Sequence, residues 1–96
     1  MIRMKIVALL HELATLVGAK ADGSEWHLFG SADRDDLDAS DIDLMILCND
    51  ALQADALRQA IDPDSLQLPL HLSFLTYDEA MQVDAVRVQR SSRIFP

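Results

Sequence analysis

The chain has 96 residues, of which 50% are hydrophobic and 25% are charged. This length suits one modest hydrophobic core, so we expect a single domain over residues 1–96, and the composition excludes a disordered or fibrous protein. The 16 acidic residues outnumber the 8 Lys and Arg, and the resulting net charge of −8 disfavours broad binding to DNA or RNA.

The hydrophobic segments also limit the class of protein. No run of apolar residues is long enough to span a membrane, and the first ten residues lack the small-residue cleavage site of a signal peptide. The one cysteine, Cys48, lies in an apolar run, where a buried and unreactive thiol is the expected state. We therefore expect a cytoplasmic protein without disulfides.

Periodicity predicts the first elements of the chain. Apolar residues recur at steps of three and four, which predicts an amphipathic helix that ends at Gly18: Ile2, Ile6, Leu9, Leu13 and Leu16. A short strand is expected over Glu25–Phe29, with Trp26 and Phe29 in the core. The segment Gly30–Arg34 then leaves this strand as a helical turn whose first N–H groups have no partner within the helix. Four aspartates follow Ala32, and we expect them to form a solvated loop face: Asp33, Asp35, Asp36 and Asp38.

The second half of the chain is predicted to alternate between strands and helices. Ile42–Cys48 is apolar on both faces, which is typical of a central strand. Asn49 and Asp50 can cap a helix whose apolar stripe is Leu52, Ala56, Leu57, Ala60 and Ile61, and the turn Asp62-Pro63-Asp64 ends it. A third strand is expected over Leu66–Thr76. Thr76 and Glu79 match a capping box for one last helix, carried by Met81, Val83, Ala85, Val86 and Val88.

The predicted order is α-β-α-β-α-β-α, an α+β fold with a small three-stranded mixed sheet flanked by helices. The first strand ends at Gly30-Ser31, whereas the second strand begins at Asp41 and Asp43. These two motifs meet only if the two strands are antiparallel, and a third strand reached through a helical crossover would be parallel to the second.

Two short motifs carry chemistry. Gly30-Ser31 offers backbone N–H groups and a hydroxyl to a phosphate. Asp41 and Asp43 are two residues apart on a strand, so their carboxylates point to the same face, where they can share a divalent cation. The pair of motifs therefore predicts a site for a nucleotide and a metal.

The segment Phe29-Gly30-Ser31, followed after nine residues by Asp41-Ile42-Asp43-Leu44, resembles the signature of the DNA polymerase β-like nucleotidyltransferase superfamily. The similarity is closest to its minimal nucleotidyltransferase domains, including those that act as antitoxins, and it covers most of the chain. The resemblance implies that Gly30 and Ser31 bind the triphosphate of a nucleoside triphosphate such as ATP, and that Asp41 and Asp43 hold Mg²⁺. Arg34 stands where many minimal members have an arginine that neutralises phosphate charge, although its neighbour Asp33 departs from their pattern.

The chain also departs from the family at the third carboxylate, an aspartate that related domains carry early in the third strand. Aligning that segment here places His71 or Ser73 at the position, depending on the register. Three interpretations are open: His71 acts as the base, a partner supplies the missing acid, or the domain binds nucleotide and metal without efficient turnover.

The resemblance implies transfer of a nucleoside monophosphate, AMP from ATP, to a hydroxyl of a partner protein. Similar small domains are often paired with an all-helical HEPN-type toxin, and the transferase is then the antitoxin. Two alternatives are a binding module that regulates its partner by contact alone and a small-molecule transferase. Arg87, Arg90 and Arg93 concentrate basic charge near the C-terminus, where they either complement a helix dipole or form a docking surface in a homo- or hetero-oligomer.

Overall fold

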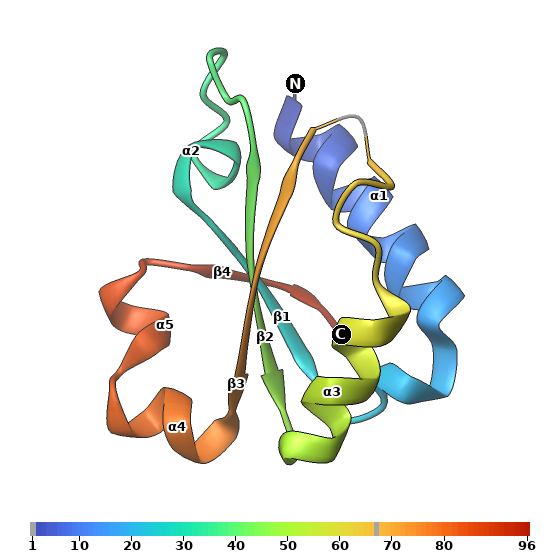
Figure 1. Cartoon of the computed structure of the whole chain (residues 1–96). Coiled ribbons are helices and arrows are strands. Elements are labelled where there is room, and N and C mark those ends of the chain that lie inside the picture. The colour runs from blue at the N-terminus through green and yellow to red at the C-terminus, as the bar shows by residue number, and fades with distance from the viewer. Residues whose placement is uncertain (1, 67) are drawn as a thin grey trace.

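The computed structural model describes residues 2–66 and 68–96 and has a mixed α+β architecture, as predicted (Figure 1). In chain order the elements are α1 (Ile2–Val17), the 3₁₀ helix η1 (Gly18–Ala21), β1 (Glu25–Phe29), α2 (Gly30–Asp33), β2 (Ile42–Cys48), α3 (Ala51–Ala60), β3 (Leu70–Thr76), α4 (Tyr77–Gln82), α5 (Ala85–Val88) and β4 (Ser92–Phe95). The third strand begins at Leu70 rather than Leu66, because the chain bends at Leu66 and Leu68; Gln67, which the prediction included in the strand, lies outside the described residues.

The four strands form one sheet in the order β3-β2-β1-β4. β1 pairs with β2 in antiparallel orientation, and β2 pairs with β3 in parallel orientation, so both predicted relationships are confirmed. The prediction of three strands is wrong, because β4 adds an antiparallel strand along β1. β4 has only four residues, and its two apolar residues Ile94 and Phe95 are adjacent. The sequence there lacks the alternation of apolar and polar residues that predicts a strand.

The prediction of one final helix is also wrong, because two short helices, α4 and α5, stand in its place. Asp84 separates them in the left-handed backbone region, with a φ of 53°. The capping box at the start of α4 is present as predicted, with the Thr76 hydroxyl accepting from the Glu79 amide and the Glu79 carboxylate accepting from the Thr76 amide. The break leaves Met81 and Val88 exposed, whereas Ala80 and Ala85 are buried.

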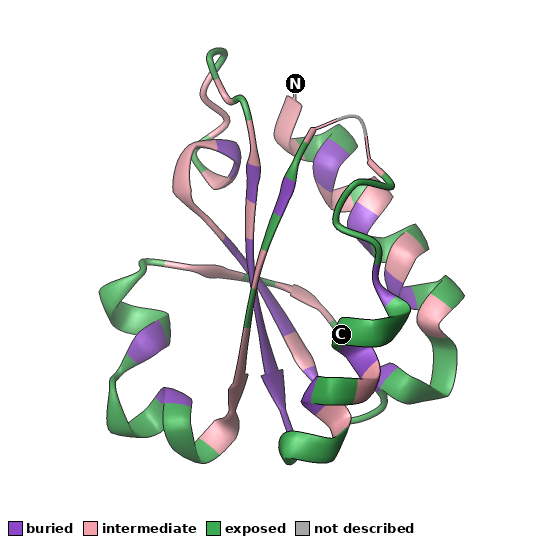
Figure 2. Cartoon of the chain, in the orientation of Figure 1, coloured by how far each residue is buried: buried purple, intermediate pink, exposed green. Residues whose placement is uncertain are grey.

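The main core lies on one face of the sheet, under α1 and α3 (Figures 1 and 2). Alternate residues of the two central strands point into it: Trp26, Leu28, Ile42, Leu44, Ile46 and Cys48. Each fully buried large side chain among them contributes about 1.5–3 kcal/mol relative to an exposed one. The predicted core position of Trp26 is confirmed. Phe29 packs instead against a second cluster on the opposite face.

That second cluster covers only part of the other face. Met45 and Leu47 are buried there against Ala80 of α4 and Ala85 of α5. Asp43 precedes them on the same face of β2 and is only half-buried. The helices α4 and α5 therefore cover the end of β2 and leave its beginning accessible, which is where the predicted site lies.

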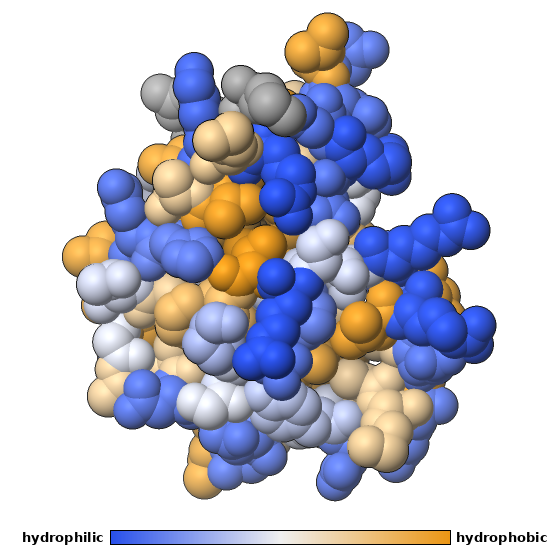
Figure 3. All heavy atoms as spheres, turned by 180° about the vertical axis from the view of Figure 1, so that it is seen from behind, coloured by the Kyte–Doolittle hydropathy of each residue, from blue (hydrophilic) through white to orange (hydrophobic). Residues whose placement is uncertain are grey.

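The surface seen from behind has a central group of hydrophobic side chains bordered by hydrophilic ones (Figure 3). Over residues 2–66 and 68–96, no helix combines the length and the hydrophobicity that crossing a membrane requires.

Candidate nucleotide and metal site

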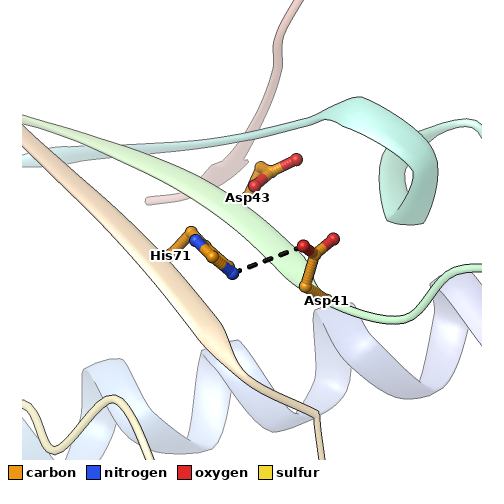
Figure 4. A group of neighbouring side chains, drawn as sticks. All are labelled: Asp41, Asp43 and His71. Atoms are coloured by element: carbon orange, nitrogen blue, oxygen red, sulfur yellow. Dashed lines mark ion pairs between the residues drawn. The ribbon is translucent and has the colours of Figure 1, made fainter.

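The two aspartates lie at the start of β2, with Asp41 directly before the strand and Asp43 inside it. Ile42 between them is 1% exposed and points into the main core, so the carboxylates on either side project from the opposite face (Figure 4). The Ile42 amide donates to the Pro69 carbonyl over 2.9 Å, which fixes the start of β2 beside β3. The strand pattern therefore places both carboxylates together, as predicted.

His71 joins this pair from the neighbouring strand. It is the register partner of Asp43 in the parallel pairing of β2 with β3. Its Nε2 lies 3.3 Å from Oδ2 of Asp41 (Figure 4). One ligand atom from each of Asp41, Asp43 and His71 can be chosen so that all three lie within 4.8 Å of one another.

Ser73 lies two residues further along the same face of β3. Its register partner is Met45, one step beyond Asp43 into the part of the sheet that α4 and α5 cover. The register therefore places His71, rather than Ser73, beside the two aspartates.

Gly30 reaches the site from β1. The last residue of β1, Phe29, is the register partner of Asp43, so the chain turns into α2 directly beside that carboxylate. Gly30 has a φ of +75°, and a Cβ atom built on it would overlap Oδ2 of Asp43. Glycine is required here both for the backbone conformation and for the close approach. Ser31 follows in the first turn of α2.

Arg34 and its acidic neighbours are arranged differently from the predicted loop face. Arg34 is 66% exposed at the end of α2 and pairs with Asp36 over 3.2 Å. The prediction that Asp33 is solvated is wrong. Its carboxylate accepts a hydrogen bond from the Arg3 guanidinium at 3.1 Å and another from the Ser92 hydroxyl at 2.9 Å. The Asp35 carboxylate accepts from the Arg3 amide at 2.8 Å. These contacts with α1 and β4 span the chain, so no local pattern reveals them.

The electrostatics of the site favour a bound cation. Burial raises the pKa of the Asp43 carboxyl above its usual value, the Asp41 carboxylate raises it further, and His71 acts in the opposite direction. Two carboxylates held on one strand face repel each other, and a positive charge between them removes that repulsion. A metal ion bound between Asp41 and Asp43 would therefore remove the repulsion between their carboxylates.

The residues present fit a divalent metal. Two carboxylate oxygens and an imidazole nitrogen are all accepted metal ligands, and the side chains that carry them are partly exposed to solvent. Ligands of one ion with bonds of about 2.1 Å lie about 3–4 Å apart, so small side-chain rotations would bring these atoms onto a common ion. Asp41, Asp43 and His71 are therefore the residues that could hold it.

A family model described as nucleotidyltransferase domain matches residues 8–95, which is nearly the whole chain. Neither the curated proteins nor the solved structures that were compared gave a match. The matched region contains all the residues of the candidate site: Gly30, Ser31, Asp41, Asp43 and His71. The chain belongs to the nucleotidyltransferase domain family.

Proposed function

We propose that the chain transfers a nucleoside monophosphate, AMP from ATP, to a hydroxyl group of a partner protein. The observation that supports this most strongly is the convergence of Gly30, Asp41 and Asp43 at one end of the sheet, in a domain of the nucleotidyltransferase family. In this proposal the glycine turn binds the phosphates of ATP, and the two carboxylates bind a divalent metal. The resemblance to the family implies that this metal is Mg²⁺.

The chain's own residues position the reacting groups. The amides of Gly30 and Ser31 and the Ser31 hydroxyl hold the triphosphate beside Asp43, and Arg34 leaves its Asp36 partner to neutralise phosphate charge. The acceptor oxygen then attacks the α-phosphorus, the bond from that phosphorus to pyrophosphate breaks, and the hydroxyl proton passes to solvent water, which reaches this exposed site. A divalent metal held by Asp41 and Asp43 supplies charge neutralisation for the phosphates.

The openness of the site supports a large acceptor. The side chains of Asp41 and His71 are 37% and 62% exposed, so a protein surface can reach them. Met81, Val83 and Val88, from the segment that covers the same face of the sheet, are more than half exposed. These side chains lie on the segment that covers the other end of β2, away from the site, where they would add an apolar contact for a protein partner. By resemblance to the paired minimal transferases, we propose an all-helical HEPN-type toxin as the partner and an antitoxin role for this chain.

Labelled ATP tests the proposal. The chain is incubated with a candidate helical partner, Mg²⁺ or Mn²⁺, and ATP labelled at either the α- or the γ-phosphate. Nucleotidyl transfer predicts that the partner acquires label from α-labelled ATP only, and that Asp41→Asn and Asp43→Asn each abolish it. Label from γ-labelled ATP, or transfer that persists in both variants, would contradict the proposal.

A second candidate function rests on the missing third carboxylate. His71 stands where related domains carry an aspartate, and this replacement favours a domain that binds metal and nucleotide and regulates its partner by contact alone. Tight partner binding without transfer, unchanged by the two aspartate substitutions, would support this alternative.

A further inference from the structure

His71 changes the chemistry of the metal site that the proposed function requires. Its Nε2 is directed at Asp41 Oδ2, 3.3 Å away, and its strand register places it opposite Asp43. Figure 4 shows this nitrogen directed at the Asp41 carboxylate, on the face of the sheet from which Asp43 also projects. A base that removes a proton from an acceptor would instead direct its nitrogen at the approaching hydroxyl.

Metal ions differ in how they accept such a ligand set. Mg²⁺ is a hard cation that prefers oxygen ligands in near-ideal octahedral geometry. First-row transition-metal dications accept imidazole nitrogen together with carboxylate oxygen, and their affinity for such sites rises along the series from Mn²⁺ to Co²⁺. A site with two carboxylates and one imidazole is thus a poorer match for Mg²⁺ than a site with three carboxylates.

We propose that His71 is a metal ligand and that it makes the site select first-row transition-metal dications over Mg²⁺. This inference rests on the proposed function only in requiring that Asp41 and Asp43 hold a metal. The geometry supports ligation directly, since each of the three residues offers a ligand atom within 4.8 Å of the others. Gly30 gives the Asp43 carboxylate the room it needs in this position, because a Cβ atom on Gly30 would overlap its Oδ2 and displace it.

Metal titration of the full chain tests the inference without an activity assay. Mn²⁺, Co²⁺ and Mg²⁺ are each titrated calorimetrically at one fixed pH, and the visible absorption of bound Co²⁺ reports whether a nitrogen ligand is present. We expect the wild-type chain to bind Mn²⁺ and Co²⁺ at least about tenfold more tightly than Mg²⁺.

Two substitutions of His71 separate ligation from other roles. In His71→Gln the affinity for Mn²⁺ and Co²⁺ should fall by about tenfold or more while the affinity for Mg²⁺ changes little. In His71→Asp, which restores three carboxylates, Mg²⁺ affinity should rise and the preference for transition metals should shrink. His11→Gln removes a second exposed imidazole, on α1, and should change none of these affinities.

The outcomes distinguish this inference from the proposed function. If His71→Gln and His71→Asp leave the relative metal affinities unchanged, His71 is no ligand and the inference is overturned, even if α-labelled AMP is still transferred. A slower transfer in His71→Gln with unaltered metal binding would likewise overturn it, because that pattern identifies a base. If metal selectivity shifts as expected but no transfer occurs to any acceptor, the metal site stands and the enzymatic proposal fails.

Discussion

Gly30 and Asp43 lie so close together that a methyl group on Gly30 would overlap the Asp43 carboxylate. Gly30 directly follows β1 and Asp43 lies in β2, so the antiparallel pairing of these two strands brings them together. The glycine turn that we propose as the phosphate-binding element therefore abuts a carboxylate that could hold a cation. This arrangement suits a ligand that carries both charges, such as a metal-bound triphosphate.

Gly30→Ala should damage the site as well as the fold. The substitution forces a side chain into a positive-φ conformation, which we expect to destabilise the protein by about 1–2 kcal/mol, and it displaces the Asp43 carboxylate. Thermal unfolding and calorimetric titration with Mn²⁺ measure the two effects. The matched control is Gly18→Ala, since Gly18 also has a positive φ, of +66°, but a Cβ atom there meets nothing within 4 Å. Equal loss of metal affinity in both variants would contradict the assignment of Gly30 to the site.

Asp43→Asn should stabilise the metal-free protein at neutral pH while weakening metal binding. Burial and the neighbouring Asp41 raise the folded-state pKa of Asp43 above its unfolded value, so the charged carboxylate disfavours folding at pH values above that pKa. The penalty disappears as the pH falls and the carboxyl becomes protonated, so the gain from asparagine should shrink in acid. Melting temperatures measured with chelator over a pH series test this. Asp64→Asn, in the exposed turn before β3, should show no comparable gain.

Cys48 should resist alkylation in the native state. Its side chain points into the main core with 0% exposure, and burial raises the pKa of the thiol to about 11. At pH 8 only a small fraction of the thiol is therefore ionised to the nucleophilic thiolate, and the reagent cannot reach it in the folded protein. Mass spectrometry after iodoacetamide treatment should find Cys48 unmodified in native protein and modified in urea. Rapid modification of the native chain would contradict the packing of β2.

Phe95→Ala should destabilise the protein and alter its fluorescence. The Phe95 ring meets Trp26 edge to face, with 5.6 Å between ring centroids, and joins β4 to the main core. We expect a loss of about 2 kcal/mol, below the cost of a fully buried phenylalanine, because Phe95 is only partly buried. Trp26 is the one tryptophan, so its emission reports on this contact. Val88→Ala, at an exposed position, should change neither quantity.

The sequence predicted the central part of the fold well because local patterns encode it. The apolar run of β2 identified a strand buried on both faces over most of its length, and the positions of Gly30 and Asp43 at opposite strand ends required antiparallel pairing. Asp50 caps α3 as predicted, with its carboxylate accepting from the Gln53 amide at 2.8 Å. The strand and the helix cap depend on residues within a few positions of one another, and the pairing depends on two motifs that are close in the sequence.

The features that the sequence did not reveal depend on long-range contacts. Strand β4 is defined by pairing with β1 more than sixty residues earlier, and Asp33 is held by Arg3 and Ser92 from the two ends of the chain. His27 is buried, with Nε2 3.1 Å from Glu25 and Nδ1 3.3 Å from the hydroxyl of Ser91, which lies 64 residues later in the chain. The choice between His71 and Ser73 likewise required the register of β3, which a parallel strand pair does not encode locally.

We propose that Asp41, Asp43 and the Gly30 turn together bind a metal-bound nucleoside triphosphate. Calorimetric titration with a non-hydrolysable ATP analogue, with and without Mn²⁺, tests it without requiring an acceptor. We expect metal-dependent binding to the wild-type chain that is lost in Asp41→Asn/Asp43→Asn, although that variant remains folded. Binding of equal strength in the wild type and the double variant, or no binding to the wild type in the presence of Mn²⁺, would contradict it.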